Sequence, residues 1–256
     1  MSVQHLIDLT GKRAVVTGAG AGIGAAIATH LAQAGAIVLV TDLDAVAAEA
    51  TASSLQGLGA AASAMRCDVT STDDLVAAAE AGAGDEGLDI WVNNAGIYPT
   101  TGPLDGVTDA FVARMLDVNV RAQYSATREA VRRMPRGGSI VNLASIAGLR
   151  GGAGISAYST SKAAVIGMTR ALAAELGPTG VRINAIAPGV IDTPGVQAQL
   201  GPLKEQGIEI ERIIAGNPLR IGGRPDHIAR VALFLVSPLA EFVTGQTIVA
   251  DGGSTL

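Results

Sequence analysis

The feature that most constrains the fold of this chain is a regular alternation of two kinds of segment along its 256 residues. Near-continuous apolar runs, typical of parallel strands covered on both faces, occur at 13–17, 37–41, 60–67, 90–93, 138–143, 181–186 and 247–250. Alanine-rich segments with helical spacing of apolar residues occur at 23–34, 44–56, 72–83, 108–134, 157–176 and 225–237. This alternation predicts right-handed βαβ units and hence an α/β fold, a doubly wound parallel sheet with helices on both faces.

The whole chain, 1–256, is expected to form a single domain, because no linker or low-complexity segment divides it. Its one long irregular stretch, 190–216, follows the carboxyl end of an expected strand, where ligands bind in sheets of this kind. A loop of that length in a compact domain is usually functional. We therefore expect 190–216 to form a lid over a substrate.

Composition excludes several classes of function. The net charge is −5 and only 3% of residues are aromatic, so neither a nucleic-acid partner nor an anionic membrane surface is expected. The apolar runs are too short to span a bilayer, and the N-terminal residues lack a signal-peptide pattern. The only cysteine, Cys67, allows no intrachain disulfide and fits a reducing, cytoplasmic compartment. The three histidines show no metal-ligand spacing, so no metal is expected.

A glycine-rich segment, Thr17-Gly18-Ala19-Gly20-Ala21-Gly22-Ile23-Gly24, joins the first expected strand to the first helix. Gly18 would allow a tight turn, Gly22 would let backbone amides approach a pyrophosphate, and Gly24 would permit close helix–strand contact. The phosphates would lie at a helix N-terminus, which favours anions. An ATP-binding Walker loop is excluded because no Gly-Lys-Ser/Thr follows, whereas a methyltransferase-like motif and a merely flexible loop stay open.

Asp42 ends the second expected strand, eighteen residues after Gly24. A carboxylate there can accept hydrogen bonds from the adenosine ribose, and it would repel a 2′-phosphate by about 1–4 kcal/mol at about 4 Å. Leu43 follows it, and the glycine segment holds no Lys or Arg, so no cation offsets the repulsion. NAD(H) is therefore expected rather than NADP(H). The alternative role of Asp42, a helix N-cap, suits Asp44 better.

Two further strand ends carry polar residues. Asp68-Val69 could hold the adenine, although an ordinary turn would use the same aspartate. Asn93-Asn94-Ala95-Gly96 combines asparagines, which can tie strand ends together, with a glycine that leaves room for a cofactor. A structural role stays open for this second motif.

Tyr158 and Lys162 are four residues apart, so on a helix they share one face, with Cβ atoms about 5–6 Å apart. A nearby ammonium favours phenolate and lets a tyrosine exchange a proton nearer neutral pH. Ser145, thirteen residues before Tyr158, is a neutral donor for the oxygen of a carbonyl that receives a hydride. Alone, the four-residue spacing is that of an ordinary helix-surface contact.

Together these segments resemble the short-chain dehydrogenase/reductase family, over nearly the whole chain and in the family's order. The motifs that carry the resemblance are Thr17–Gly24, Asp68-Val69, Asn93–Gly96, Asn119, Ser145, Tyr158-x-x-x-Lys162, Asn184-x-x-x-Pro188-Gly189, Thr193 and Asp251-Gly252-Gly253. The resemblance implies a Rossmann-like sheet of seven parallel strands and an NAD(H)-dependent oxidoreductase that interconverts a secondary alcohol and a ketone. Ala144 stands where many relatives carry a second serine.

The resemblance also implies roles for single residues. Ser145 would bind the substrate oxygen, Tyr158 would be the general acid/base, and Lys162 would bind the nicotinamide ribose and lower the pKa of the tyrosine. Asn119 would hold a water that connects the lysine to solvent. The expected cofactor-binding residues are Gly18, Gly22, Ile23, Gly24, Asp42, Leu43, Asp68, Val69, Asn94, Ala95, Gly96, Tyr158, Lys162, Pro188, Gly189, Ile191 and Thr193.

The substrate is less constrained. Ser145, Tyr158, Tyr98 and Ile146 are its expected contacts, and Ile97, Pro99 and the lid are further candidates for the pocket wall. Apolar residues in the lid favour a small, neutral, mostly hydrocarbon alcohol or ketone, although they could equally pack the lid against the core. Arg150 could approach the mouth of the pocket.

Other functions stay open. A 3-oxoacyl-carrier-protein reductase fits the same motifs, but such enzymes more often prefer NADPH. A non-catalytic NAD-binding protein would share the fold, and a sugar-nucleotide epimerase or dehydratase would need an added substrate domain. The family usually forms tetramers through helices that correspond to 108–134 and 157–176, whose small residues permit close contact, so a homotetramer is expected.

Overall fold

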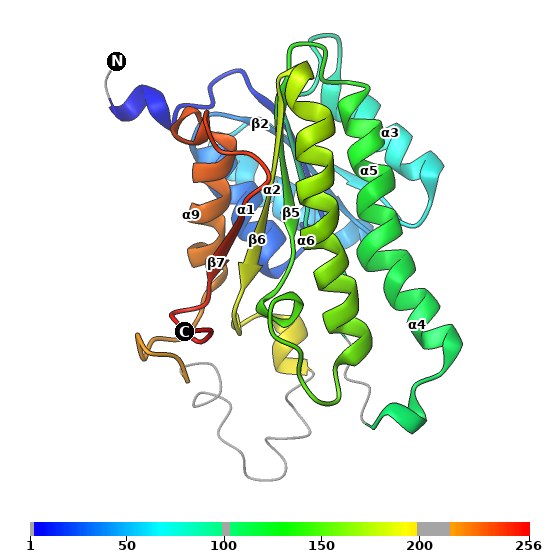
Figure 1. The fold of residues 1–256 in the computed structure, drawn as a ribbon. Coiled ribbons are helices and arrows are strands. Elements are labelled where there is room, and N and C mark those ends of the chain that lie inside the picture. The colour runs from blue at the N-terminus through cyan, green and yellow to red at the C-terminus, as the bar shows by residue number, and fades with distance from the viewer. Residues whose placement is uncertain (1–2, 99–102, 199–215) are drawn as a thin grey trace.

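The computed structural model describes residues 3–98, 103–198 and 216–256. Its centre is one sheet of seven parallel strands in the order β3-β2-β1-β4-β5-β6-β7 (Figure 1). The strands are β1 (Arg13–Thr17), β2 (Ile37–Asp42), β3 (Ala62–Arg66), β4 (Ile90–Asn93), β5 (Gly138–Leu143), β6 (Val181–Pro188) and β7 (Thr247–Ala250). The predicted doubly wound, Rossmann-like α/β fold is confirmed.

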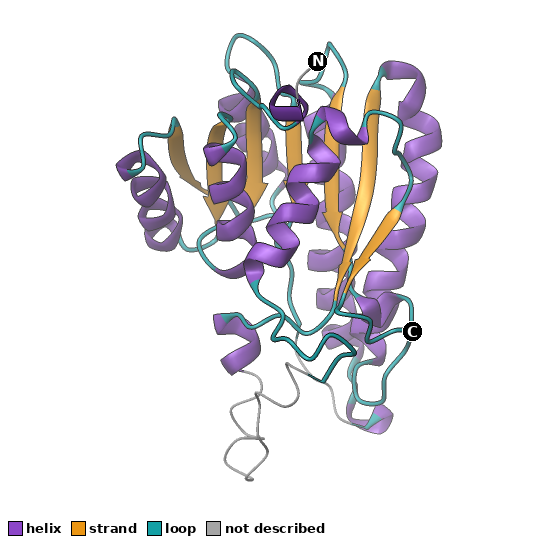
Figure 2. Ribbon diagram, turned by 90° about the vertical axis from the view of Figure 1, so that its left-hand side faces the viewer, coloured by secondary structure: helices purple, strands orange, loops and turns teal. Residues whose placement is uncertain are grey.

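Helices cover both faces of the sheet (Figure 2). The α-helices are α1 (Gly22–Gln33), α2 (Ala45–Gly57), α3 (Thr72–Ala83), α4 (Asp109–Leu116), α5 (Ala122–Val131), α6 (Ser156–Leu176) and α9 (Pro225–Val236). Short 3-10 turns are η1 (Val3–Leu6), η2 (Leu104–Gly106), η4 (Ile146–Gly148), η5 (Gly177–Thr179) and η6 (Pro238–Ala240). Helices α1, α2 and α9 pack on one face, and α3, α5 and α6 pack on the other. Within the described ranges, no helix is long and apolar enough to cross a bilayer.

The apolar runs are continuous because each strand buries both of its faces. Ala14 and Val16 of β1 belong to the core cluster beneath α1, α2 and α9, whereas Val15 belongs to the cluster beneath α3, α5 and α6. All three side chains are at most 1% exposed. Successive side chains of a strand point to opposite faces, so a doubly covered strand has no polar side to show in the sequence.

The order of the strands reverses between β1 and β4. From β1 the chain proceeds to β2 and β3 on one side, and β4 then begins the other half of the sheet on the opposite side of β1. A crevice forms outside the carboxyl ends of the strands at such a point, and ligands of doubly wound sheets bind there. The glycine-rich segment, Asn94 and Ser145 all follow strands at this edge.

The segment 108–134 is not the uninterrupted α-helix that its periodicity predicts. Helix α4 passes into a π-helical turn, η3 (Asp117–Arg121), before α5 continues. A π turn admits an extra residue into a helix and often marks a functional position. Asn119 lies in this turn, and its side chain is hydrogen-bonded to both backbone groups of Ile97. This contact joins segments far apart in the chain, so helical spacing alone could not reveal the turn.

Candidate active site

The glycine-rich turn between β1 and α1 is held closely against the end of β4. Gly18 and Gly22 have φ angles of 60° and 58°, which glycine adopts without strain. A Cβ on Gly24 would lie 2.3 Å from the carbonyl oxygen of Gly18 and 2.5 Å from Nδ2 of Asn94, so no side chain fits there. Ala21, the N-cap of α1, makes no side-chain cap hydrogen bond. The first N–H groups of α1 therefore have no side-chain cap to compete with an anion.

Asn94 joins the ends of β1 and β4. Its Nδ2 donates to the carbonyl oxygens of Thr17 (2.9 Å) and Gly18 (2.8 Å). In return, Oγ1 of Thr17 accepts from the backbone N–H groups of Asn94 and Ala95, each at 3.1 Å. A Cβ on Gly18 would lie 2.8 Å from Cα of Ala95. The predicted tie between strand ends is therefore present, and it fixes the glycine turn at the crevice.

Asn93 belongs instead to the interior. Its Nδ2 donates to Oδ1 of Asn142 on β5 (2.8 Å) and to Oγ1 of Thr127 on α5 (3.0 Å). Its Oδ1 accepts from Nε1 of Trp91 at 2.7 Å. All four side chains are buried, and these bonds satisfy polar groups that would otherwise be costly to bury. The structural interpretation thus holds for Asn93, whereas Asn94 and Gly96 line the main cavity.

The carboxylate of Asp42, at the end of β2, is tied to the glycine turn. Its Oδ2 accepts from the N–H of Gly20 (2.9 Å), and its Oδ1 accepts from the N–H of Asp44 (3.0 Å). Asp44 itself caps α2 by accepting from the N–H groups of Val46 and Ala47, as expected. Each carboxylate oxygen can accept more than one hydrogen bond, so Asp42 keeps acceptor capacity for a ribose. The contact with Gly20 had no signal in the sequence.

Asp68, just after β3, holds a turn. Its Oδ1 accepts from the backbone N–H (2.9 Å) and the hydroxyl (2.7 Å) of Thr70, and these bonds keep the pKa of the carboxyl below its ordinary value. Asp68, Val69, Asp42 and Leu43 do not line the main cavity. The contact of Asp68-Val69 with adenine stays a prediction.

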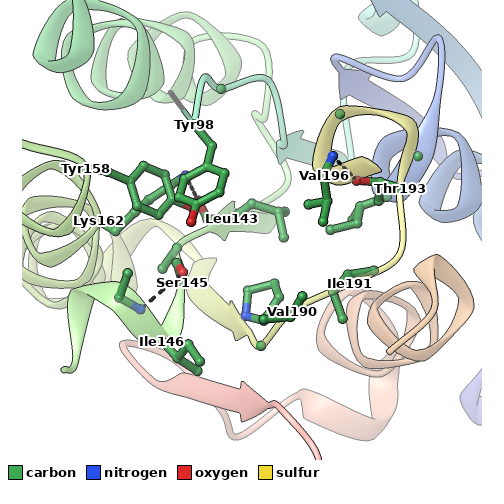
Figure 3. A pocket seen from close by; sticks show the side chains of 18 of the residues that line it. Tyr98, Leu143, Ser145, Ile146, Tyr158, Lys162, Val190, Ile191, Thr193 and Val196 are labelled. Carbon is green, nitrogen blue, oxygen red and sulfur yellow. Dashed lines mark hydrogen bonds between the residues drawn. The ribbon is translucent and has the colours of Figure 1, made fainter. Parts of the chain in front are cut away.

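Ser145, Tyr158 and Lys162 lie together in the wall of the cavity (Figure 3). Ser145 follows β5 and caps η4, where its Oγ accepts from the N–H of Ala147 at 3.1 Å. Tyr158 and Lys162 come from the first turns of α6. The Nζ of Lys162 lies over the phenol ring, 5.7 Å from its centroid, and donates to the carbonyl oxygen of Leu143 at 2.7 Å.

The protein's own groups raise the pKa of Tyr158. Burial is the main cause and brings the pKa to about 12; Tyr98, whose ring packs edge-on with a centroid distance of 4.5 Å, adds to it, and a hydrogen bond with Ser145 opposes it. Burial lowers the pKa of Lys162 to about 8. The pKa of Tyr158 is therefore raised rather than lowered, contrary to the lowering expected from Lys162, because desolvation of the buried phenol is the largest influence on it.

Asn119 connects the wall of the cavity to α6. Its Oδ1 accepts from the N–H of Ile97 (2.8 Å), and its Nδ2 donates to the carbonyl oxygen of Ile97 (2.9 Å) and to Oγ of Ser161 (3.1 Å). Ser161 in turn donates to the carbonyl oxygen of Tyr158 at 2.7 Å. A Cβ on Gly96 would lie only 3.0 Å from Oδ1 of Asn119. The water that the family resemblance implies at Asn119 stays a prediction.

The cavity has a volume of about 980 Å³. The predicted site residues that line it are Gly22, Ile23, Asn94, Gly96, Tyr98, Ser145, Ile146, Tyr158, Lys162, Pro188, Gly189, Ile191 and Thr193. Four further predicted residues contact this lining without being part of it: Gly18, Gly24, Ala95 and Asn119. Of the expected lid, Val190 and Val196 line the cavity, whereas 199–215 and Pro99 lie outside the described residues.

Sequence reasoning missed part of the wall. Arg114 on α4 and the C-terminal residues Ser254 and Thr255 line the cavity. Arg150, which was expected to approach the mouth of the pocket, is also part of the lining. Only the Asp251-Gly252-Gly253 motif hinted that the C-terminal segment reaches the site. In the part of the chain that the structure describes, no group of three His, Cys, Asp or Glu side chains could hold a metal ion.

Comparison with known proteins agrees with this geometry. A family model described as enoyl-(acyl-carrier-protein) reductase matches residues 18–255. The 7alpha-hydroxysteroid dehydrogenase of Escherichia coli (strain K12) is 38% identical over 250 residues, which cover 96% of this chain and 95% of that protein. The 3-oxoacyl-[acyl-carrier-protein] reductase FabG of Thermotoga maritima is 36% identical over 256 residues, covering 96% and 98%.

A solved structure shares the whole architecture. A 7alpha-hydroxysteroid dehydrogenase complexed with NADH and 7-oxo glycochenodeoxycholic acid superposes with a TM-score of 0.92 at 37% identity, over 99% of this chain and 98% of the other. The similarity therefore extends from the glycine turn through the Ser145, Tyr158 and Lys162 wall to the C-terminal segment. The chain belongs to the short-chain dehydrogenase/reductase family of oxidoreductases.

Proposed function

We propose that this protein interconverts a secondary alcohol and a ketone with NAD(H), and that Tyr158 exchanges the proton. The observation that carries the proposal is the meeting of Ser145, Tyr158 and Lys162 with the glycine turn in one cavity. A solved relative that is similar over nearly all of this chain was complexed with NADH and a ketone acid, which supports the assignment of cofactor and reaction.

The glycine turn fits the pyrophosphate of a dinucleotide. It leaves no room for a Cβ at Gly24 and exposes the start of a helix that no side chain caps. Gly22 and Thr193 approach each other across this turn, at 3.4 Å from a Cβ built on Gly22 to Cγ2 of Thr193. The remaining predicted cofactor contacts are proposed to follow the crevice from this turn. Ile191 would contact the carboxamide through its backbone, and Thr193 would bind the carboxamide or a phosphate.

When bound, a nicotinamide cofactor accepts or delivers the hydride. Ser145 then holds the substrate oxygen, and Tyr158 removes the hydroxyl proton during oxidation or returns it during reduction. The protein's own groups leave the pKa of Tyr158 at about 12. The phenolate is therefore favoured only when the positive charge of the oxidised nicotinamide acts together with that of Lys162. Asn119 keeps Ile97 and α6 in position behind this wall.

The decisive test is a screen of NAD reduction against chemically diverse secondary alcohols, followed by NADH fluorescence, with NADP as the control cofactor. NADH formation that is lost in Tyr158→Phe supports the proposal. A protein that binds NADH but oxidises no alcohol and reduces no ketone would instead be the non-catalytic NAD-binding alternative.

A 3-oxoacyl-carrier-protein reductase is the second candidate function. A relative with this name covers nearly the whole chain at 36% identity. The carboxylate of Asp42 beside the glycine turn weighs against it, because such enzymes more often use NADPH. Reduction of a 3-oxoacyl thioester faster with NADPH than with NADH would favour this candidate.

Replacing Asp42 with asparagine is expected to narrow the preference for NAD over NADP by about 5-fold to several hundred-fold in kcat/KM, the range that corresponds to about 1–4 kcal/mol of removed charge repulsion. Asparagine keeps an oxygen that can accept from the N–H of Gly20, so the turn should survive. Steady-state kinetics with both cofactors measures the ratio. Asp44→Asn, which changes a neighbouring carboxylate that caps α2, is the matched control, and an equal effect there would contradict the assignment.

The assembly is proposed to be a cytoplasmic homotetramer. The helical segments 108–134 and 157–176 are rich in small residues, and small-residue faces allow helices of neighbouring subunits to approach closely. Static light scattering should give four times the chain mass of 25.6 kDa. A monomeric mass would reject this assembly.

We also propose, as part of the proposed function, that residues 190–216 form a lid over the substrate.

A further inference from the structure

The cavity is positively charged. Its described lining contains three basic side chains, Arg114, Arg150 and Lys162, and no acidic one. Lys162 is buried against the phenol of Tyr158 and has its place in the proposed reaction. The two arginines have no role in the proposed proton and hydride transfer, so their presence in the cavity lining needs a separate explanation.

Arg150 belongs to the cavity lining, and its side chain is exposed. It follows Ser145 by five residues, just after η4, and its Nη1 donates to the backbone carbonyl oxygen of Ser254 at 3.2 Å. Among the described residues, no carboxylate forms an ion pair with it within 4.0 Å. A guanidinium has five N–H donors in a planar fork that matches a carboxylate. The hydrogen bond to Ser254 uses one of these donors and leaves the others for a ligand.

The C-terminal segment 251–255, which includes the hydrogen-bond partner of Arg150, is held by its own internal hydrogen bonds. Asp251 accepts from the N–H of Gly253 and from both the N–H and the hydroxyl of Thr255, each at 2.8 Å. Burial works against ionisation of this carboxyl, but these hydrogen bonds outweigh it and keep the pKa of Asp251 below its ordinary value. The negative charge of Asp251 is therefore engaged within its own turn, and Ser254 offers Arg150 a fixed anchor.

Much of the cavity lining is apolar. It includes Ile146, Ile155, Val190 and Val196, and the ring of Tyr98 packs edge-on against Tyr158. Apolar walls bind a hydrocarbon body, and a few placed polar groups fix its orientation. A guanidinium on such a wall favours a ligand that is apolar along most of its length and anionic at one end.

We propose that Arg150 is a specificity-determining residue that binds a carboxylate of the substrate, so that the substrate is a hydroxy acid or keto acid with an apolar ring or chain between its two functional groups. This inference rests on the proposed function and replaces the neutral substrate expected from the sequence. The sequence placed Arg150 only near the mouth, and the structure adds its anchor, its lack of a described ion-pair partner and its apolar surroundings.

The experiment measures binding of ketone probes to the full chain saturated with NAD⁺, a combination that cannot react. The probes are cyclohexanones with a carboxylate at the fourth ring carbon, attached directly or through two or four methylene groups, each paired with its primary amide. Titration calorimetry should show that the wild type binds at least one acid about 10–100-fold more tightly than its amide, as expected for hydrogen bonds to a charged group. Equal binding of acid and amide at all three lengths overturns the proposal.

Substitutions of the two pocket arginines show which residue causes the preference for the acid over the amide. In Arg150→Gln the ratio of acid to amide affinity should fall to about 1, whereas Arg150→Lys should retain part of it, because a lysine keeps the charge but loses the fork. Arg114→Gln removes the other pocket arginine and should leave the ratio as in the wild type. A preference that survives Arg150→Gln, or that disappears only in Arg114→Gln, overturns the assignment of Arg150.

A second measurement distinguishes failure of the proposed oxidoreductase function from failure of the role of Arg150. The alcohol forms of the same probes, incubated with NAD⁺, report turnover independently of the binding ratio. Absence of NADH formation from every alcohol counts against the oxidoreductase activity, even where the acid still binds more tightly than the amide. Turnover of amides and acids at equal kcat/KM, without a difference in binding, retains the activity and rejects the role of Arg150.

Discussion

Tyr158→Phe is expected to lower kcat for alcohol oxidation by about 10²–10⁴-fold, the usual contribution of a positioned acid/base group. The substitution removes one hydroxyl and keeps the ring that packs against Tyr98, so the wall of the cavity should retain its shape. Lys162 and the glycine turn are untouched, and the Kd of NADH should stay within about threefold of the wild-type value, less than the tenfold that 1.4 kcal/mol represents.

Rapid kinetics with a secondary alcohol and fluorescence titration with NADH measure the two quantities. Tyr124→Phe is the matched control, because Tyr124 lies half exposed on α5, outside the cavity lining, and loses the same hydroxyl. Wild-type turnover in Tyr158→Phe would show that another group exchanges the proton.

The pH profile gives the same assignment an independent check. Oxidation needs the phenolate of Tyr158, and the protein's own groups place its pKa at about 12. The rate of oxidation should therefore rise with pH until the pKa of Tyr158 in the complex with NAD⁺ is passed, whereas ketone reduction should weaken as pH rises. The alkaline rise should be absent from the residual activity of Tyr158→Phe.

Lys162→Met is expected to weaken NAD binding and to lower kcat, while the free energy of unfolding at pH 7 does not fall. Lys162 is 5% exposed, and its ammonium donates a hydrogen bond to the carbonyl oxygen of Leu143. Its pKa of about 8 instead of 10.5 corresponds to a cost of about 3 kcal/mol for keeping the charge in the folded protein. Methionine has a similar length and avoids that cost, so function and stability should respond in opposite directions.

The pH dependence of stability follows from the same shift. Between pH 8 and 10.5 the unfolded chain keeps a proton on Lys162 that the folded chain has released, so unfolding takes up a proton and stability rises with pH across this window. Urea titrations from pH 7 to 10.5 should show this rise in the wild type and a smaller one in Lys162→Met.

Lys12→Met is the control for loss of a lysine. The side chain of Lys12 is 52% exposed and pairs with Asp89, so the substitution should change stability by no more than about 1 kcal/mol. A large fall in stability for Lys162→Met at pH 7 would mean that the lysine holds the fold together rather than serving the reaction.

The sequence by itself determined the fold class and most of the elements. The first, fourth, fifth and seventh strands have the predicted bounds, because a strand buried on both faces is a continuous apolar run that can be recognised without its neighbours. The third is shorter than predicted, at Ala62–Arg66, and the sixth extends to Pro188. The spacing of the glycine turn and of Tyr158 and Lys162 is equally local, since a turn and one face of a helix depend on residues a few positions apart.

Only the tertiary structure decided what happens where distant segments meet. The π turn at Asn119 accompanies hydrogen bonds to Ile97, and Asp42 at the end of β2 accepts a hydrogen bond from Gly20 in the turn after β1. The direction of the pKa shift of Tyr158 followed from burial rather than from the spacing of the lysine, because desolvation depends on everything packed around a group. Arg150 lies in the cavity wall and donates a hydrogen bond to the backbone of Ser254, more than a hundred residues further along the chain. No local sequence pattern encodes such a contact.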